Sequence, residues 1–141
     1  MRLPEECERR HSESRFSVKE QKSEVIFENE NLLEIFQYLV DGCIFTIQDQ
    51  KRCDWLINVR GAKLSIFVEL KGSDIEAAYE QLKHTQMTLL SLVNDKRIWI
   101  ISYSGSPRMS TSFQNLILKA RSECNGAKLR IEASPYTHFL K

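Results

Sequence analysis

Three ionisable residues interrupt two apolar runs near the middle of the chain, where a strand would normally carry Val or Ile. Asp54 opens the run DWLINV, and Glu69 and Lys71 lie in the run LSIFVELK. Successive side chains of an extended strand alternate between faces, so Glu69 and Lys71 project to the same side. If the two runs pair as neighbouring strands, one carboxylate from each meets near one end of the sheet, with an ammonium beside them.

The types of these three residues indicate a particular chemistry. Burying unpaired charges is costly, so such a group implies a cleft, a metal or mutual compensation. Two carboxylates on rigid strands offer the oxygen ligands that Mg²⁺ prefers and leave positions for water and a substrate phosphate. A bound divalent ion activates water and neutralises charge on a scissile phosphate, and Lys71 could orient or deprotonate that water. The plainer alternative is an ion pair between Glu69 and Lys71 on an exposed strand face.

The elements that must position these residues are mostly strands. Short apolar runs bounded by turn signals predict strands at 24–28, 53–59, 65–71 and 98–103, and an edge strand at 129–133. Residues 32–40 fit either an amphipathic helix or a strand. Asp41-Gly42 between two apolar runs is a hairpin signal, which favours a strand over 33–39 and a second strand over 43–47.

Two helices follow from their start and stop signals. Ser73-Asp74-Ile75-Glu76 is a capping box, and apolar residues at helical spacing continue to about Val93. A second box, Thr111-Ser112-Phe113-Gln114, begins a helix that Asn125-Gly126 ends. The strand, helix, strand order predicts a right-handed crossover that makes 65–71 and 98–103 parallel. The expected fold class is α/β, with a mixed central sheet and at least two flanking helices.

The length and composition favour one domain. The chain has 141 residues and a hydrophobic content of 42%, which suffices for one sizeable core. Residues 1–22 have few large apolar groups, so we expect a mobile or loosely docked N-terminal extension, with a short helix around residues 5–10 as an option. Residues 23–141 are then a single α/β domain.

The charge pattern is regional. The net charge is only +1, but residues 104–141 carry six basic and two acidic side chains. This quarter could face phosphates, although a solvated helix and an edge strand would look the same. Its basic residues are Arg108, Lys119, Arg121, Lys128, Arg130 and Lys141.

The cysteines and the N-terminus bear on location. Cys7, Cys43, Cys53 and Cys124 show neither CxxC pairing nor zinc-finger spacing, so we expect free thiols in a reducing compartment. The N-terminal residues lack the apolar core of a signal peptide, and no stretch has the ~20 apolar residues of a membrane span. The expectation is a cytoplasmic protein that is not in a membrane.

The order of the charged residues resembles the PD-(D/E)XK nuclease superfamily, whose core has a strand bearing Asp, a second bearing (Asp/Glu)-x-Lys, and a following helix. The match here is Asp54, then Glu69-Leu70-Lys71 and the capped helix, roughly residues 43 to 103. The resemblance implies a restriction-endonuclease-like core, similar to Holliday-junction resolvases. It also implies that Asp54, Glu69 and the backbone carbonyl of Leu70 bind Mg²⁺ or Mn²⁺, and that Lys71 is the catalytic lysine.

The sequence departs from the superfamily pattern at two places. Cys53 stands where a proline often precedes the Asp. Branches that resemble RecB-type nucleases carry Gln-xxx-Tyr on the helix; Gln81 is at a similar place and is a candidate catalytic residue, but Thr85 stands where that Tyr would be. An acidic residue on an N-terminal element often completes such a site, and the candidates are Glu24, Glu28 and Asp41.

The resulting expectation is a Mg²⁺-dependent nuclease, a hydrolase that acts on DNA in preference to RNA. No separate sequence-reading module is visible, so specificity would come from nucleic-acid structure, a dimer or a partner protein. A homodimer would place two sites on two strands. The alternative is a nuclease-like domain without activity that binds nucleic acid or a protein partner.

Overall fold

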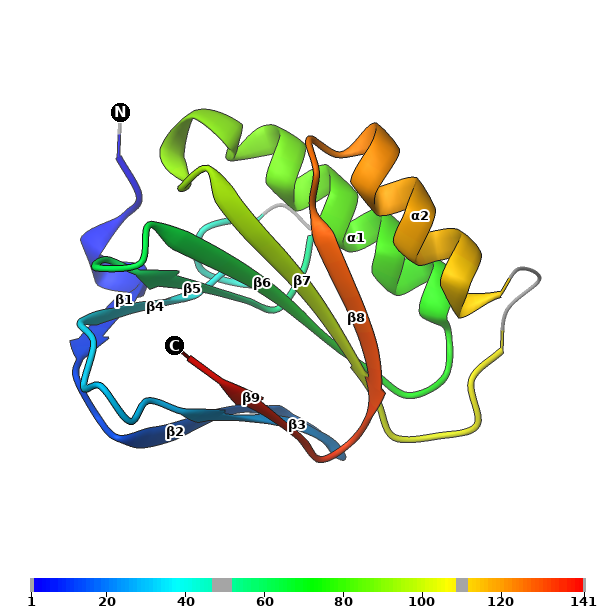
Figure 1. The fold of residues 1–141 in the computed structure, drawn as a ribbon, viewed down its shortest axis with the longest axis horizontal. Coiled ribbons are helices and arrows are strands. Elements are labelled where there is room, and N and C mark those ends of the chain that lie inside the picture. Colours follow the sequence, from blue (N-terminus) through cyan, green and yellow to red (C-terminus); the bar gives the residue numbers. More distant parts are fainter. Residues whose placement is uncertain (1, 47–51, 109–111, 141) are drawn as a thin grey trace.

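The structure is a computed structural model that describes residues 2–46, 52–108 and 112–140. These residues form two sheets and two α-helices (Figure 1). The larger sheet has the spatial order β1 (Glu8–His11), β4 (Ile35–Leu39), β5 (Trp55–Val59), β6 (Leu64–Lys71), β7 (Lys96–Tyr103) and β8 (Lys128–Ala133). The smaller sheet has the order β2 (Arg15–Glu20), β3 (Ser23–Glu28) and β9 (Tyr136–Phe139). The helices are α1 (Ile75–Thr88) and α2 (Phe113–Glu123), and 3₁₀ turns span Glu5–Cys7 and Leu90–Leu92.

The centre of the larger sheet is the β5–β6 hairpin, followed by the crossover through α1 to β7. In the antiparallel β5–β6 pair Trp55 lies opposite Val68, and in the parallel β6–β7 pair Glu69 lies opposite Ile101. The parallel pairing that the strand, helix, strand order predicts is confirmed. β8 adds a further parallel strand, so the sheet is mixed, as expected.

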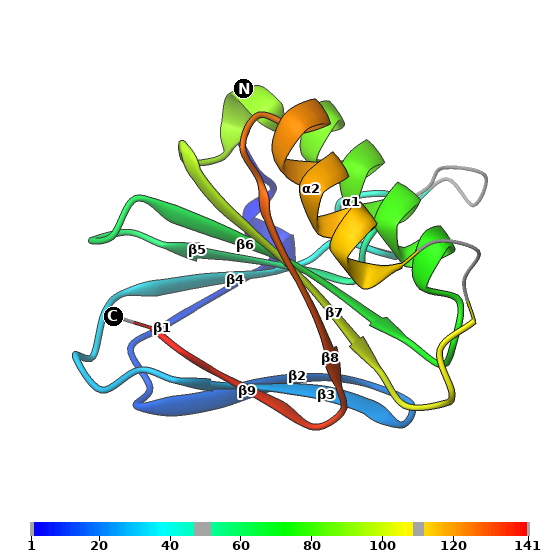
Figure 2. The same ribbon diagram turned by 45° about the vertical axis from the view of Figure 1, so that its right-hand side comes forward.

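The larger sheet is covered on both faces, by two different kinds of layer. Helices α1 and α2 cover one face, and the three-stranded sheet covers the other (Figure 2). Phe67 and Trp99 pack in the core under the helices, whereas Val68 and Ile100 pack in the core against the smaller sheet. The apolar run 98–103 therefore owes its composition to burial on both sides. None of the described helices is long and apolar enough to cross a membrane.

A buried polar relay fixes α1 between the sheet and the end of α2. The Trp99 indole N–H donates to Gln86 Oε1 at 2.8 Å, and Gln86 Nε2 donates to the Cys124 carbonyl oxygen at 2.8 Å. Trp99 and the Gln86 side chain are buried, so these hydrogen bonds hold in a low-dielectric interior. The relay restricts how α1 can shift along the sheet.

The expectation of a loose N-terminal extension over residues 1–22 is wrong. β1 pairs with β4 at one edge of the larger sheet, and β2 pairs with β3 in the smaller one. Phe16 and Val18 point into the core between the larger and the smaller sheet, with exposures of 6% and 1%. The helix considered around residues 5–10 is a single 3₁₀ turn over Glu5–Cys7 that leads straight into β1.

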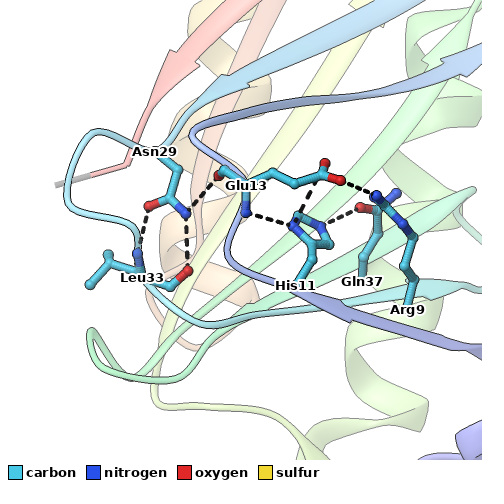
Figure 3. Close-up of polar contacts among 6 residues, drawn as sticks. All are labelled: Arg9, His11, Glu13, Asn29, Leu33 and Gln37. Atoms are coloured by element: carbon cyan, nitrogen blue, oxygen red, sulfur yellow. Dashed lines mark hydrogen bonds and ion pairs between the residues drawn. The ribbon is translucent and has the colours of Figure 1, made fainter.

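A polar network ties this N-terminal part to the rest of the fold (Figure 3). The His11 ring bonds the Gln37 side-chain oxygen at 3.1 Å and accepts from the Glu13 amide at 3.2 Å. Asn29 Nδ2 donates to the carbonyls of Glu13 and Leu33, and Asn29 Oδ1 accepts from the Leu33 amide. Asn29 is fully buried, and its side chain satisfies three backbone groups of the two segments that it joins.

The four cysteines are not all free thiols, which corrects the sequence-based expectation. Cys7 and Cys43 form a disulfide that joins the first 3₁₀ turn to the segment after β4. Cys53 and Cys124 are free and buried. Because two of the four cysteines form a disulfide, the cysteines no longer indicate a reducing compartment. The cytoplasmic location stays a prediction.

The strand predicted over 33–39 is confirmed as β4, but the strand predicted over 43–47 is wrong within the described residues; residue 47 lies outside them. Asp41-Gly42 does make a turn, with Gly42 at a φ of +87°, and the Phe45 amide donates to the Val40 carbonyl. The second hairpin strand cannot form because β1 and β5 occupy both edges of β4.

Both predicted helices exist, and their caps differ by one residue from the predicted positions. The N-cap of α1 is Asp74, whose side chain accepts from the Ala77 amide, and α1 ends at Thr88 instead of near Val93. Ser112 caps α2 by accepting from the Asn115 amide at 3.1 Å. Residue 111 lies outside the described residues. Asn125 and Gly126 both have positive φ and end α2 as predicted.

The network around Asn29 generates a stability prediction. Asn29→Ala removes three hydrogen bonds that a buried side chain makes to the backbone, so we expect the free energy of unfolding to fall by about 2–3 kcal/mol. Urea denaturation measures this change. Asn31→Ala, at an exposed position in the same loop, is the control and should change stability by less than about 0.5 kcal/mol. Equal effects of the two substitutions would contradict the role given to Asn29.

Candidate active site

Asp54 and Glu69 come together because β5 and β6 pair in the predicted way. The Asp54 amide donates to the Val68 carbonyl at 3.1 Å, which extends the ladder by one residue and places Asp54 opposite Glu69. Both side chains face the helices, since Asp54 shares a face with Leu56 and Glu69 shares one with Phe67. The two carboxyl groups lie within hydrogen-bonding reach of each other.

The carboxyl pair is nearly closed to water. Glu69 is 2% exposed and Asp54 is 9% exposed. Burial, and then the charge of Asp54, raise the pKa of Glu69 to about 9, although the Lys71 charge opposes the shift. Burial also raises the pKa of Asp54, against the hydrogen bond that its Oδ2 accepts from the Leu70 amide at 2.8 Å. At neutral pH Glu69 therefore holds a proton, within hydrogen-bonding reach of the Asp54 carboxyl group.

One oxygen of this pair is left without an ordinary partner. Glu69 Oε2 contacts Lys71 Nζ at 3.2 Å, whereas Glu69 Oε1 is buried and accepts no hydrogen bond from the described residues. A shared proton, a cation or a water molecule can satisfy such an oxygen beside another carboxylate. Asp54 and Glu69 are thus the residues that could hold a divalent ion, and the donor set suits a hard cation.

Lys71 lies at the mouth of the carboxyl pair. Its side chain is 27% exposed, so the ammonium is reachable from solvent while it contacts the buried Glu69. Its backbone carbonyl accepts from Ser23 Oγ at 2.8 Å and from the Ser104 amide at 3.0 Å. The end of β6 is therefore held by the smaller sheet on one side and by the segment after β7 on the other.

Helix α1 is docked against the residue before Asp54. Thr85 Oγ1 accepts from the Cys53 amide at 2.8 Å and donates to the Gln81 carbonyl oxygen at 2.7 Å. Thr85 thus has a structural contact at the position where a tyrosine would stand in the RecB-type pattern. Gln81 Oε1 is, like Glu69 Oε1, a buried oxygen without a partner among the described residues. The catalytic role of Gln81 and the ligand role of the Leu70 carbonyl stay predictions.

The three acidic residues proposed to complete the site differ in position. Asp41 follows β4, and the neighbouring Val40 amide bonds the Asp54 carbonyl at 2.9 Å. The charge of Asp41 helps to raise the pKa of Asp54, although Asp41 also forms an ion pair with Arg52. Glu28 instead pairs with Arg15 at the far end of β3.

Sequence reasoning missed a fourth acidic residue. Glu20 ends β2, and its charge also raises the pKa of Asp54. The Ser23 hydroxyl that bonds the Lys71 carbonyl brings this β2–β3 turn to the site, whereas Glu24 is tied by its backbone to Ser134. The alternation of Phe16 and Val18 was the available signal for β2. In the described parts of the chain no group of three His, Cys, Asp or Glu side chains could hold a metal.

The basic C-terminal quarter does not form one surface. Arg108 lies near the start of α1, where its Nε donates to Ser73 Oγ at 3.1 Å. Lys119 sits over the Tyr79 ring, 5.3 Å from the centroid. Residue 141 lies outside the described residues. The remaining three cations, Arg121, Lys128 and Arg130, line a separate pocket.

The raised pKa of Glu69 predicts how stability depends on pH. The folded state keeps a proton that the unfolded state loses above its ordinary pKa of 4.5, so the free energy of unfolding falls as pH rises from about 4.5 to about 9. The slope approaches about 1.4 kcal/mol per pH unit. Glu69→Gln cannot titrate, so its stability relative to the wild type should rise with pH.

Urea denaturation in EDTA at several pH values from 5 to 9 measures this difference. Glu30→Gln, at an exposed turn, is the matched control and should run parallel to the wild type. Parallel curves for Glu69→Gln and the wild type would mean that Glu69 is ionised in the folded protein and that the two carboxyl groups share no proton.

Comparisons with protein-family models, with curated proteins and with solved structures found no match to this chain. Its function therefore has to be argued from the site itself. The features that carry weight are the two buried carboxyl groups, the ammonium beside them and the docked helix α1.

Proposed function

We propose that this protein is a divalent-metal-dependent nuclease that hydrolyses phosphodiester bonds in nucleic acid, with DNA preferred over RNA. The observation that carries the proposal is the buried Asp54–Glu69 carboxyl pair with Lys71 Nζ 3.2 Å from Glu69. A protein has little reason to bury two carboxyl groups side by side for stability alone, because burial disfavours their charged forms. Perturbed groups of this kind are typical of functional sites.

The surrounding elements support the same proposal. β5 with its preceding Asp54, β6 with Glu69-Leu70-Lys71, and the capped helix α1 follow one another as the PD-(D/E)XK resemblance requires. The parallel strand β7 after α1 fits a restriction-endonuclease-like core. A three-stranded sheet covers the face opposite the helices.

Each residue has a distinct role in the proposed reaction. The carboxylates of Asp54 and Glu69 would hold Mg²⁺ or Mn²⁺, and Glu69 would lose its proton to bind the ion. The ion would supply an activated water and charge neutralisation at the scissile phosphate. Lys71, at the exposed mouth, orients the attacking water and offsets negative charge that develops on the phosphate. The buried neighbours Leu70 and Thr85 keep the carboxyl groups in place.

A second candidate function is a nuclease-like domain that has lost activity and binds nucleic acid or a protein partner. The observation that favours it is that the described residues bring together two carboxyl groups and no third metal-ligating side chain. In that case Glu69 keeps its proton and its contact with Lys71, and no metal ion replaces them. The two candidates differ in one measurable property, which is metal-dependent cleavage.

The cleavage experiment uses single-stranded, duplex and branched DNA, and RNA, in Mg²⁺, in Mn²⁺ and in EDTA. We expect the wild type to cleave at least one substrate with either metal and none in EDTA. Asp54→Asn, Glu69→Gln and Lys71→Ala should each lower the cleavage rate at least ~100-fold, because each removes a charge that acts on the reacting phosphate.

Two charge-matched controls lie at the opposite end of β6. Asp95→Asn and Lys63→Gln remove the same charges from exposed positions and should leave cleavage unchanged. Undiminished cleavage in Lys71→Ala would contradict its role, and full activity in Glu69→Gln would contradict the metal site. A wild type that binds nucleic acid but cleaves none of the substrates would favour the inactive domain.

A further inference from the structure

A pocket lies along the open edge of β8, away from the carboxyl pair. Its volume is about 360 Å³, and four consecutive residues, 127–130, contribute to its wall together with Ile117 and Arg121 of α2 and His138 of β9. Consecutive strand residues point to opposite faces. This pocket touches all four residues, and it also touches α2 on one face of the sheet and β9 on the other. It must therefore follow the edge of β8. Among the described strands β8 pairs with β7 alone, so this edge is unpaired.

The wall of this pocket is strongly positive. Arg121, Lys128 and Arg130 contribute three permanent charges from two elements, and no acidic side chain lines the pocket. Arg121 and Lys128 have no ion-pair partner in the described parts of the chain, and Arg130 has only an exposed one, Glu132 at 3.7 Å. Like charges that line one pocket repel one another, and a bound anion relieves that repulsion.

The remaining polar group of the wall is the His138 imidazole. Burial first, and then the charge of Arg130, lower the pKa of His138, so the ring is neutral at pH 7. Its Nδ1 lies 3.2 Å from the Tyr136 hydroxyl. A neutral imidazole adds a hydrogen-bonding group without adding a fourth charge. The rest of the wall is aliphatic, including Ile98 and Ile117, and offers no side chain that reads the hydrogen-bonding edges of bases.

We propose that this pocket binds a backbone phosphate of a nucleic-acid strand and positions the strand for the Asp54–Glu69 site, a proposal that rests on the proposed nuclease function. Three cations with no acid suit a phosphate, and a phosphate contact carries no sequence information of its own. An extended polypeptide strand could also pair with the open edge of β8, but the charges of Lys128 and Arg130 favour a polyanion.

The register of the sheet gives the distance between the two sites. Glu69 lies opposite Ile101, and Ile101 lies opposite Ile131, three residues after Lys128. Two strand spacings and three residues correspond to about 14 Å between the α-carbons of Glu69 and Lys128. This is less than half a helical turn of duplex, which is about 34–36 Å. Glu69 faces the helices, whereas Lys128 alternates with Leu129, which packs under them, so a strand that contacts both sites has to pass around an edge of the sheet.

The test measures binding of a fluorescent single-stranded DNA by anisotropy in EDTA over a series of salt concentrations. Binding in EDTA needs no cleavage, so the result is independent of the nuclease assay. The variant is Lys128→Gln/Arg130→Gln, which keeps the side-chain stems. The control is Arg9→Gln/Arg10→Gln on β1, which removes the same net charge at the opposite edge of the larger sheet.

We expect the affinity of the pocket variant to fall at least ~3-fold at low salt. Its slope of log affinity against log salt should become shallower by about 0.7 for each phosphate that the variant no longer neutralises. The control should keep the wild-type slope. Equal slopes in all three proteins would overturn the proposal. So would an unchanged slope combined with loss of self-association in sedimentation, because a protein strand would then occupy the edge of β8.

A second measurement distinguishes a site for the phosphates of nucleic acid from a site for free inorganic phosphate. Inorganic phosphate and then the single-stranded DNA are titrated while the ring resonances of His138 are followed by NMR. Shifts of the ring with the DNA at concentrations far below those needed for inorganic phosphate support a nucleic-acid site. Shifts with inorganic phosphate alone would overturn the proposal in favour of a small-anion site. If the wild type binds DNA at this pocket but cleaves none of the substrates, the nuclease function is refuted and the binding site stands.

Discussion

Two carboxyl groups on adjacent antiparallel strands, held against one ammonium and almost closed to water, are the feature on which the rest of the structure depends. Asp54 and Glu69 can share this space only if one carries a proton or if a cation lies between them. Their positions are fixed from three directions. The Leu70 amide bonds Asp54, Thr85 of α1 bonds the residue before it, and Ser23 bonds the carbonyl of Lys71. Both layers that cover the sheet thus act on the site.

The centre of this arrangement could be predicted from the sequence because it depends on local rules. The alternation of side chains in LSIFVELK places Glu69 and Lys71 on one face, and the short connection to DWLINV makes the two runs an antiparallel pair. The crossover rule then makes 98–103 parallel to 65–71. The starts of both helices could be predicted from their capping residues. The actual N-caps, Asp74 and Ser112, lie one residue after the predicted ones.

What the sequence did not reveal depends on contacts between distant segments. β1 has no apolar alternation of its own, and it forms because β4 offers a free edge and because His11 bonds Gln37. The predicted strand over 43–47 fails for the converse reason, since that edge is already occupied. The disulfide joins Cys7 to Cys43 across 36 residues, and no spacing motif marks it. The influence of the Glu20 charge on Asp54 follows only from the fold of β2.

The central claim is that Asp54 and Glu69 together bind one divalent cation. Anomalous scattering from crystals soaked in Mn²⁺ tests it most directly, with Glu69→Gln crystals as the comparison. The account predicts one anomalous peak between the two carboxylates in the wild type, about 2.0–2.2 Å from an oxygen of each, and no peak there in the variant. A peak elsewhere, or a wild-type pair that keeps its Lys71 contact and shows no peak at pH 8 or above, would contradict it.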